Sequence, residues 1–423
     1  MQNIQAVLNT FSSLEINPQL AFSNIPKGNN QYLTHGYHRY PAKFIPSLAS
    51  YLIKQNTKKE DLICDPFGGC GTTLVEAKIN GRQSIGIDIN PLAGLISKAK
   101  ITAINPKKLE GETKKLLVRI KTNLPYKQVA NPRLLYWFDM NTLTKLQNIY
   151  GGILETKDKQ IQRFYICAFS HILKNCSRWL MKSIKPTIDK DKKTIDVKTA
   201  FLRHLLFMSK KNNEFYLKLS KINSNICNAK FYLRDARNTE LPENSVDYIL
   251  TSPPYVTSYE YADLHELSLL WLEDIDDWVG FKKKFIGTSH RDNKDKDLHS
   301  EIGNSIVAKL LNKDKSLHRS VRTYYEDMYD FLSESKRILK KRKKISLVIG
   351  NTTLKDVDIL NAEVAFEQML ALGFRNLKVE KRQTSSQSIT PYRDLKSGRF
   401  TSVNNPLKRR AYQYEYILTG QKN

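Results

Sequence analysis

The stretch ICDPFGGCGTTLVEA, residues 63–77, decides the fold of this chain. The apolar run from Leu62 to Asp65 predicts a short buried strand that ends on a carboxylate. Three glycines then permit a tight turn, and Thr72 or Thr73 can cap the helix that follows. No lysine follows the last glycine, as a phosphate-binding loop requires, and the glycines depart from the G-x-G-x-x-G spacing. The helix start therefore offers free N–H groups to a ligand that carries no pyrophosphate.

A second strand follows this helix and ends on Asp88, within the segment SIGIDINP at 84–91. A carboxylate at this place suits the two hydroxyls of a ribose. The glycine turn and Asp88 together indicate an adenosine-containing ligand without a pyrophosphate. S-adenosylmethionine meets that description.

Short apolar strands alternate with helical patterns along the whole chain, which predicts an α/β fold with a Rossmann-like, mostly parallel sheet. Ligands of such sheets bind at the carboxyl ends of the strands. The predicted strands are 62–65, 84–88, 231–233, 248–251, 345–349, 377–380 and 412–418.

Two insertions interrupt this pattern. The strands at 84–88 and 231–233 lie much farther apart than one crossover helix needs, and helical periodicity fills 134–223. Residues 272–321 are polar, with little periodicity, and are expected to form a mobile loop. The remaining expected parts are an N-terminal extension (1–30), a cofactor-binding part (31–133), a catalytic part (224–271) and a C-terminal part of the core (322–423).

The segment NSVDYILTSPPYVTS, residues 244–258, places a rigid polar turn after another strand. Two prolines remove N–H donors, which leaves carbonyls and the Ser252 hydroxyl as acceptors beside the ring of Tyr255. Such a turn can hold a planar base whose exocyclic amino group donates to Ser252 and to the Pro253 carbonyl. The nitrogen lone pair then points at a methyl donor, and catalysis is mainly orientation. Upstream, Asp235 ends the preceding strand, where it can accept from the adenine amino group of a cofactor.

These motifs together resemble the S-adenosylmethionine-dependent amino-methyltransferases of DNA. The resemblance rests on DPFGGCGTT, IGIDINP, RDARNTELP and TSPPY, and on the upstream block HGYHRYPAKFIPSLASYLI at 35–53. It implies a seven-stranded class I methyltransferase fold, S-adenosylmethionine as cofactor, no metal, and double-stranded DNA whose target base is flipped out. It implies catalytic roles for Ser252, Pro253, Pro254 and Tyr255. The implied cofactor-binding residues are Tyr40, Pro41, Lys43, Phe44, Asp65, Pro66, Phe67, Gly69, Gly71, Thr72, Asp88, Ile89, Asp235, Ala236 and Thr251.

The serine of the TSPPY motif bears on the target base. Serine is commoner in the family's cytosine-N4 enzymes, so we predict cytosine N4, with adenine N6 as the alternative. The resemblance also suggests a restriction–modification setting with a cognate restriction endonuclease as partner. Two other functions stay open: an RNA guanine-N2 methyltransferase, and a non-catalytic DNA-binding subunit with the same fold.

The charge balance agrees with a nucleic-acid substrate. Lys and Arg number 68 against 42 Asp and Glu, a net charge of +26. Candidate DNA contacts are Arg178, Lys182, Lys185, Lys408, Arg409 and Arg410, and a basic run occupies 336–344. We expect the insertion at 134–223 to recognise the DNA target and the insertion at 272–321 to contact DNA. No apolar run reaches the ~20 residues of a membrane span, and the N-terminal residues do not resemble a secretory signal. Five irregularly spaced cysteines predict neither a disulfide framework nor a metal site, so we expect a prokaryotic cytoplasmic protein bound to the nucleoid.

Overall fold

The computed structural model describes most of the chain. The described residues are 4–22, 29–40, 43–122, 131–181, 183, 186–222, 227–256, 261–272, 277–288, 290–291, 296–383, 392–396, 400–410 and 414–423.

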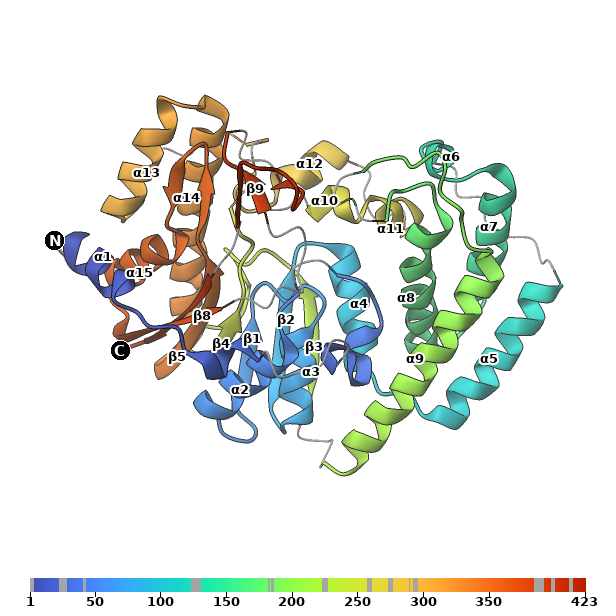
Figure 1. The fold of residues 1–423 in the computed structure, drawn as a ribbon. Coiled ribbons are helices and arrows are strands. Elements are labelled where there is room, and N and C mark those ends of the chain that lie inside the picture. Colours follow the sequence, from blue (N-terminus) through green and yellow to red (C-terminus); the bar gives the residue numbers. More distant parts are fainter. Residues whose placement is uncertain are drawn as a thin grey trace.

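A seven-stranded sheet forms the centre of the molecule (Figure 1). Its strands are β1 (Leu62–Asp65), β2 (Gln83–Asp88), β3 (Ala229–Leu233), β4 (Val246–Thr251), β5 (Leu339–Gly350), β8 (Arg375–Gln383) and β12 (Tyr414–Gln421). They follow the order β3-β2-β1-β4-β5-β12-β8. The first five strands are parallel, and β12 runs antiparallel between β5 and β8. All seven strands predicted from the sequence are present, and the predicted Rossmann-like fold class is confirmed.

Helices cover both faces of the sheet because the buried strands are apolar on both sides. Successive residues of β1, Ile63 and Cys64, belong to hydrophobic clusters on opposite faces. One cluster includes helix α2 (Pro46–Asn56), and part of α3 (Thr72–Ile79) reaches it through Ala77. The other includes α1 (Ile4–Ser12), α14 (Lys315–Ile338) and α15 (Asn361–Ala371).

A group of long helices stands beside the β3 edge, next to α4 (Pro91–Ile101) (Figure 1). They are α5 (Pro106–Lys121), α6 (Leu134–Trp137), α7 (Met140–Leu154), α8 (Lys159–Cys176) and α9 (Val197–Ser220). The helical periodicity expected over 134–223 corresponds to α6, α7, α8 and α9. Helix α5 also packs against α7 and α9, so this helical layer includes residues before 134.

The expectation of a loop over 272–321 is wrong for much of that range. The structure has α12 (Trp278–Lys283) and α13 (Glu301–Leu311), and α14 begins at Lys315. Helix α13 buries Ile302, Ile306 and Leu310, which recur every four residues and pack with α14. The many charged residues before it obscured this short periodic pattern.

The remaining elements are small. They are η1 (Pro18–Ala21), η2 (Asn29–Gln31), η3 (Leu33–Gly36), α10 (Tyr261–Leu264), α11 (Glu266–Leu272), the hairpin β6 (Thr352–Leu354) and β7 (Val357–Ile359), and a three-stranded sheet of β9 (Tyr392–Asp394), β10 (Phe400–Thr401) and β11 (Lys408–Arg410). All five cysteines are free and buried. Among the described residues, no helix could cross a membrane and no cluster of metal-ligating side chains occurs.

Candidate active site

A cavity of about 330 Å³ opens at the carboxyl ends of β1, β2, β3 and β4. It brings together the glycine turn, Asp88 and the Ser-Pro-Pro-Tyr segment, which lie far apart in the sequence. The predicted site residues that line it are Tyr40, Lys43, Phe44, Asp65, Pro66, Phe67, Gly69, Thr72, Asp88, Ile89, Asp235, Ala236, Ser252, Pro254 and Tyr255.

Three predicted residues of the described chain, Gly71, Thr251 and Pro253, do not line the cavity. Gly71 precedes α3 with a φ of 74°, and a Cβ there would lie 2.8 Å from the Ser97 Oγ. Thr251 and Pro253 are buried, and Pro41 lies outside the described residues. Gly71 is itself the N-cap of α3, so neither Thr72 nor Thr73 caps that helix, contrary to expectation. Gly71 and Thr251 therefore support the cavity from behind.

Two backbone N–H groups, one from the glycine turn and one from the residue two positions after Asp88, hold the Asp88 carboxylate in place. Its Oδ2 accepts from the Gly69 N–H at 3.0 Å, and its Oδ1 accepts from the Asn90 N–H at 2.9 Å. Each carboxylate oxygen has a second lone pair, which can accept from a ligand hydroxyl. The geometry of Asp88 therefore suits a ribose.

Asp65 occupies the end of the neighbouring strand. Its Oδ1 accepts from the Thr251 hydroxyl at 2.6 Å and from the Phe67 N–H at 3.2 Å. Burial raises the pKa of Asp65 and of Asp88 to about 6 each, although these hydrogen bonds oppose the rise. The charges in this cavity thus depend on pH just below neutrality.

His265 lies behind the cavity and does not share that pH dependence. Its Nδ1 is 2.9 Å from the Asn90 Nδ2, and its ring packs against the ring of Tyr40, with centroids 4.9 Å apart. Burial lowers the pKa of His265 to about 3, so the ring is neutral near pH 7. His265 therefore fixes Asn90 and Tyr40 without adding charge.

The Ser-Pro-Pro-Tyr segment is anchored through both of its hydroxyls. The Ser252 hydroxyl donates to the Val348 carbonyl at 3.0 Å, so its own lone pairs stay available to accept. The Tyr255 hydroxyl donates to Glu415 Oε1 at 2.9 Å. Both donors are used within the protein, and the Ser252 oxygen can serve as an acceptor in the cavity.

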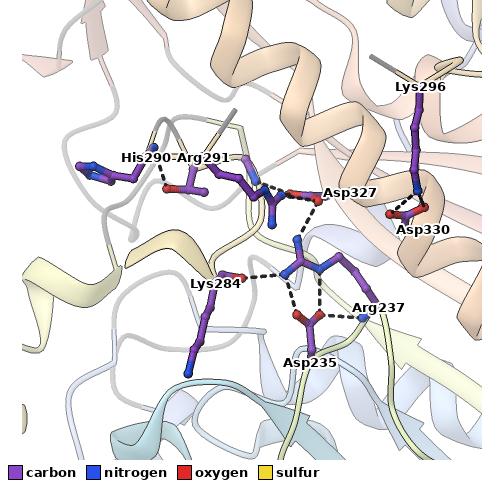
Figure 2. Close-up of polar contacts among 10 residues, drawn as sticks. Asp235, Arg237, Lys284, His290, Arg291, Lys296, Asp327 and Asp330 are labelled. Carbon is purple, nitrogen blue, oxygen red and sulfur yellow. Dashed lines mark hydrogen bonds and ion pairs between the residues drawn. The ribbon is translucent and has the colours of Figure 1, made fainter. Parts of the chain in front are cut away.

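The Asp235 carboxylate is engaged by a neighbouring arginine (Figure 2). Arg237 Nε donates to Asp235 Oδ1 at 2.9 Å, and Arg237 Nη2 donates to Asp235 Oδ2 at 2.6 Å. The same guanidinium donates to Asp327 Oδ1 at 2.7 Å and to the Lys284 carbonyl at 2.9 Å. Asp235 lines the cavity as expected, but this fork occupies its carboxylate, and its role toward adenine stays a prediction.

Residues 284–288 form a wall of the cavity that the sequence did not predict. Asp327 holds this wall: it is 1% exposed, and its Oδ2 accepts from the Gly287 N–H at 3.1 Å. Arg291 also donates to Asp327 (Figure 2). The other lining residues that we did not predict are Gly68, Cys70, Asn90, Arg234, Ser316, Leu317 and Ser320. No motif marks residues 284–288, which lie in the segment expected to contact DNA.

Of the predicted DNA-contacting residues, Arg178, Lys408 and Arg409 are described with their side chains, and none of these three lines the cavity. Lys408 Nζ lies over the Tyr392 ring, 5.6 Å from its centroid, and Arg409 pairs with Asp358 at 3.6 Å. Arg178 follows α8, where its N–H donates to the Trp137 carbonyl. Lys182 and Lys185 lie outside the described residues, and Arg410 ends β11. The role of these six residues in DNA binding stays a prediction.

The basic run at 336–344 joins the end of α14 to the start of β5. It is therefore at the amino end of the sheet, away from the cavity at the carboxyl ends. Lys340 and Lys343 pair there with Asp247 at 3.0 and 3.1 Å. This run therefore links β5 to the neighbouring strand β4.

The sheet order, the antiparallel β12 and the cavity at the carboxyl edge define a class I methyltransferase fold. Residues 5–97 match the N6/N4 DNA methylase family, described as "DNA methylase". The chain is 29% identical over 379 residues to the type II methyltransferase M.MvaI of Kocuria varians. This alignment covers 82% of this chain and 83% of M.MvaI. It is 28% identical over 282 residues to the type II methyltransferase M.BsoBI of Geobacillus stearothermophilus, with 58% and 54% covered. The family match and these relatives support the resemblance to the N6/N4 DNA methylases that the sequence motifs indicate.

Solved structures of methyltransferases align with most of the chain at low similarity. An S-adenosylmethionine-dependent methyltransferase of Methanosarcina mazei aligns with 91% of this chain and 98% of its own, at 9% identity and a TM-score of 0.31. The rRNA methyltransferase AviRa of Streptomyces viridochromogenes aligns with 90% and 86%, at 10% identity and a TM-score of 0.32.

Proposed function

We propose that this DNA methyltransferase transfers a methyl group from S-adenosylmethionine to N4 of a cytosine flipped out of double-stranded DNA. One observation carries the proposal: the Ser252 oxygen lies in the same cavity as Asp88 and Gly69, with its hydroxyl proton already given to the Val348 carbonyl. An acceptor beside the cofactor cavity suits an amino group that must be oriented toward a methyl donor.

The cavity residues fit S-adenosylmethionine. Gly69 lines the cavity with a φ of 46°, which exposes its backbone, and Asp88 keeps free lone pairs for the ribose hydroxyls. Phe67, Ile89 and Ala236 supply apolar surface for the adenosine. The cofactor supplies an electrophilic methyl group on a sulfonium.

The residues of the chain act mainly by orientation. Ser252 accepts one amino proton, while the ring of Tyr255 stacks on the base. The second acceptor expected from the sequence, the Pro253 carbonyl, belongs to a buried residue that does not line the cavity. The nitrogen lone pair then forms the N–CH₃ bond as the S–CH₃ bond breaks, and the amino group releases one proton to water. S-adenosylhomocysteine and methylated DNA are the products, and no strong general base is needed.

A restriction–modification setting is supported by the relatives, which are named type II methyltransferases. In that setting the partner is a restriction endonuclease with the same recognition sequence, and the protein works in the cytoplasm on nucleoid DNA. The helices α6–α9 and the small β9–β11 sheet extend beyond the catalytic core, and we propose that they contact and read the DNA.

The proposal is tested by methyl transfer from radiolabelled S-adenosylmethionine to duplex DNA, with total tRNA and rRNA as parallel acceptors. We expect label in DNA alone, and we expect Ser252→Ala to lower the rate while S-adenosylmethionine binding is unchanged. Label in RNA alone, or an equal loss of cofactor binding in Ser252→Ala, contradicts the proposal.

A further inference from the structure

A carboxylate on the closing strand of the sheet touches the tyrosine of the Ser-Pro-Pro-Tyr segment. Glu415 is on β12, directly across from Gly350 at the carboxyl end of β5. Its Oε1 accepts from the Tyr255 hydroxyl at 2.9 Å. The contact joins parts of the chain 160 residues apart.

A buried arginine backs the carboxylate. Arg382 is the direct cross-strand partner of Glu415 on β8, and its Nε lies 3.4 Å from Glu415 Oε2. The Arg382 side chain is 1% exposed, and its two Nη atoms have no hydrogen-bond partner among the described residues. Glu415 is thus the one carboxylate that the described structure pairs with this buried charge.

The ion pair between Glu415 and Arg382 is expected to contribute little to the stability of the fold. Arg382 loses its hydration on burial, and an ion pair with a buried charge gains little over apolar side chains of similar volume. The pair can instead orient the Tyr255 side chain. An ionised carboxylate can only accept, so the Tyr255 hydroxyl must donate, and the position of its ring is fixed from one side.

We propose that Glu415 is a positioning residue that holds the ring of Tyr255 against the target base, with Arg382 holding Glu415. This inference rests on the proposed function, in which Tyr255 stacks on the flipped base. Small displacements of a group that orients a reactant cost rate without costing cofactor affinity. Glu415 therefore acts on the methyl-transfer step through one atom, the Tyr255 hydroxyl oxygen.

A double-mutant cycle tests whether Glu415 acts through that hydroxyl. Tyr255→Phe and Glu415→Ala are each expected to slow single-turnover methylation of duplex DNA by about tenfold, the usual effect of losing one hydrogen bond to a charged group. The double variant should be no slower than either single variant. S-adenosylmethionine affinity should stay within about twofold of wild type. Glu380→Ala is the matched control, since Glu380 is on the neighbouring strand β8, is 22% exposed against 21% for Glu415, and pairs only with Lys378 among the described residues.

Three results overturn the inference: wild-type rates in Glu415→Ala, additive losses of about 100-fold in the double variant, or the same loss in Glu380→Ala. If Glu415→Ala does not fold because Arg382 is left unpaired, the pair Arg382→Met with Glu415→Leu removes both charges. That variant should show the same tenfold loss, and Tyr255→Phe should add nothing to it. A wild-type protein that methylates no DNA would instead refute the proposed function, and this inference with it.

Discussion

Lowering the pH from 7 to 5 should weaken S-adenosylmethionine binding by about tenfold, because Asp88 must be ionised to accept from two ribose hydroxyls. Burial raises the pKa of Asp88 to about 6, and the nearby Asp65 carboxylate adds to the rise. The carboxylate therefore gains its proton within a pH range in which ordinary surface aspartates stay charged.

The magnitude follows from the ionised fraction. With a pKa of about 6, about 90% of Asp88 is ionised at pH 7 and about 10% at pH 5, a ratio near ten or ~1.4 kcal/mol. With the ordinary value of 3.8, more than about 90% would be ionised at both pH values and the affinity would not change. Asp65, also raised to about 6, titrates with Asp88 as a pair, so the measured midpoint belongs to both.

Isothermal titration calorimetry with S-adenosylmethionine across this range measures the effect. Asp88→Asn should bind weakly at every pH and show no such dependence, while wild type should lose affinity with a midpoint near pH 6. His265 stays neutral between pH 5 and pH 7 because its pKa is about 3, so it does not contribute to the pH dependence of the measured affinity. A flat affinity in the wild-type protein would refute the assignment of Asp88 as the ribose acceptor.

The same pKa shift has the opposite effect on the cofactor-free protein. The folded-state pKa of Asp88 is above its unfolded value, so the contribution of this group to stability is present below the unfolded pKa and is lost as pH rises through about 6. Thermal unfolding of the cofactor-free protein should therefore show a gain in stability from Asp88 between pH 7 and pH 5 that Asp88→Asn lacks.

Three further predictions concern turnover, the cavity wall and DNA affinity. Ser252→Ala should lower the single-turnover rate by about tenfold with unchanged cofactor affinity, since it removes one acceptor; Ser245→Ala, which changes an exposed turn on the far side of β4, is the control. Asp327→Asn should release residues 284–288 and weaken cofactor binding at least about tenfold, because it breaks a buried pair with Arg237; equal loss in the more exposed Asp330→Asn would contradict this. DNA affinity should fall steeply between about 50 and 200 mM salt, as expected for backbone contacts, and a flat salt dependence would exclude them.

The sequence predicted the strands and the shared cavity because strong local signals mark them. Each predicted strand is a short apolar run, and the first four of them end on chemistry-bearing residues such as Asp65 and Asp88. In a parallel sheet those ends meet at one edge, so the sequence alone predicts that the glycine turn and Ser252 lie in one site. The helices α8 and α9 were also predicted, since their apolar residues recur at helical spacing.

Side-chain partners across the fold could not be predicted in the same way. The fork between Asp235 and Arg237 spans two residues, but Asp327, which completes it, is 90 residues away. The wall at 284–288 carries no motif and depends on Asp327 for its place. Glu415 looks like an ordinary strand residue in sequence, and only the register of β12 with β5 and β8 places it beside Tyr255 and Arg382. Such contacts are set by strand register and tertiary packing, which local periodicity does not report.

The identity of the methylated base tests the central claim most directly. The protein is incubated with S-adenosylmethionine and unmodified genomic DNA, the DNA is digested to nucleosides, and the nucleosides are separated and identified by mass spectrometry. We expect N4-methyldeoxycytidine, and about tenfold less of it when Ser252→Ala replaces wild type at the same short reaction time. N6-methyldeoxyadenosine as the sole product would contradict the assignment of cytosine to the Ser252 site.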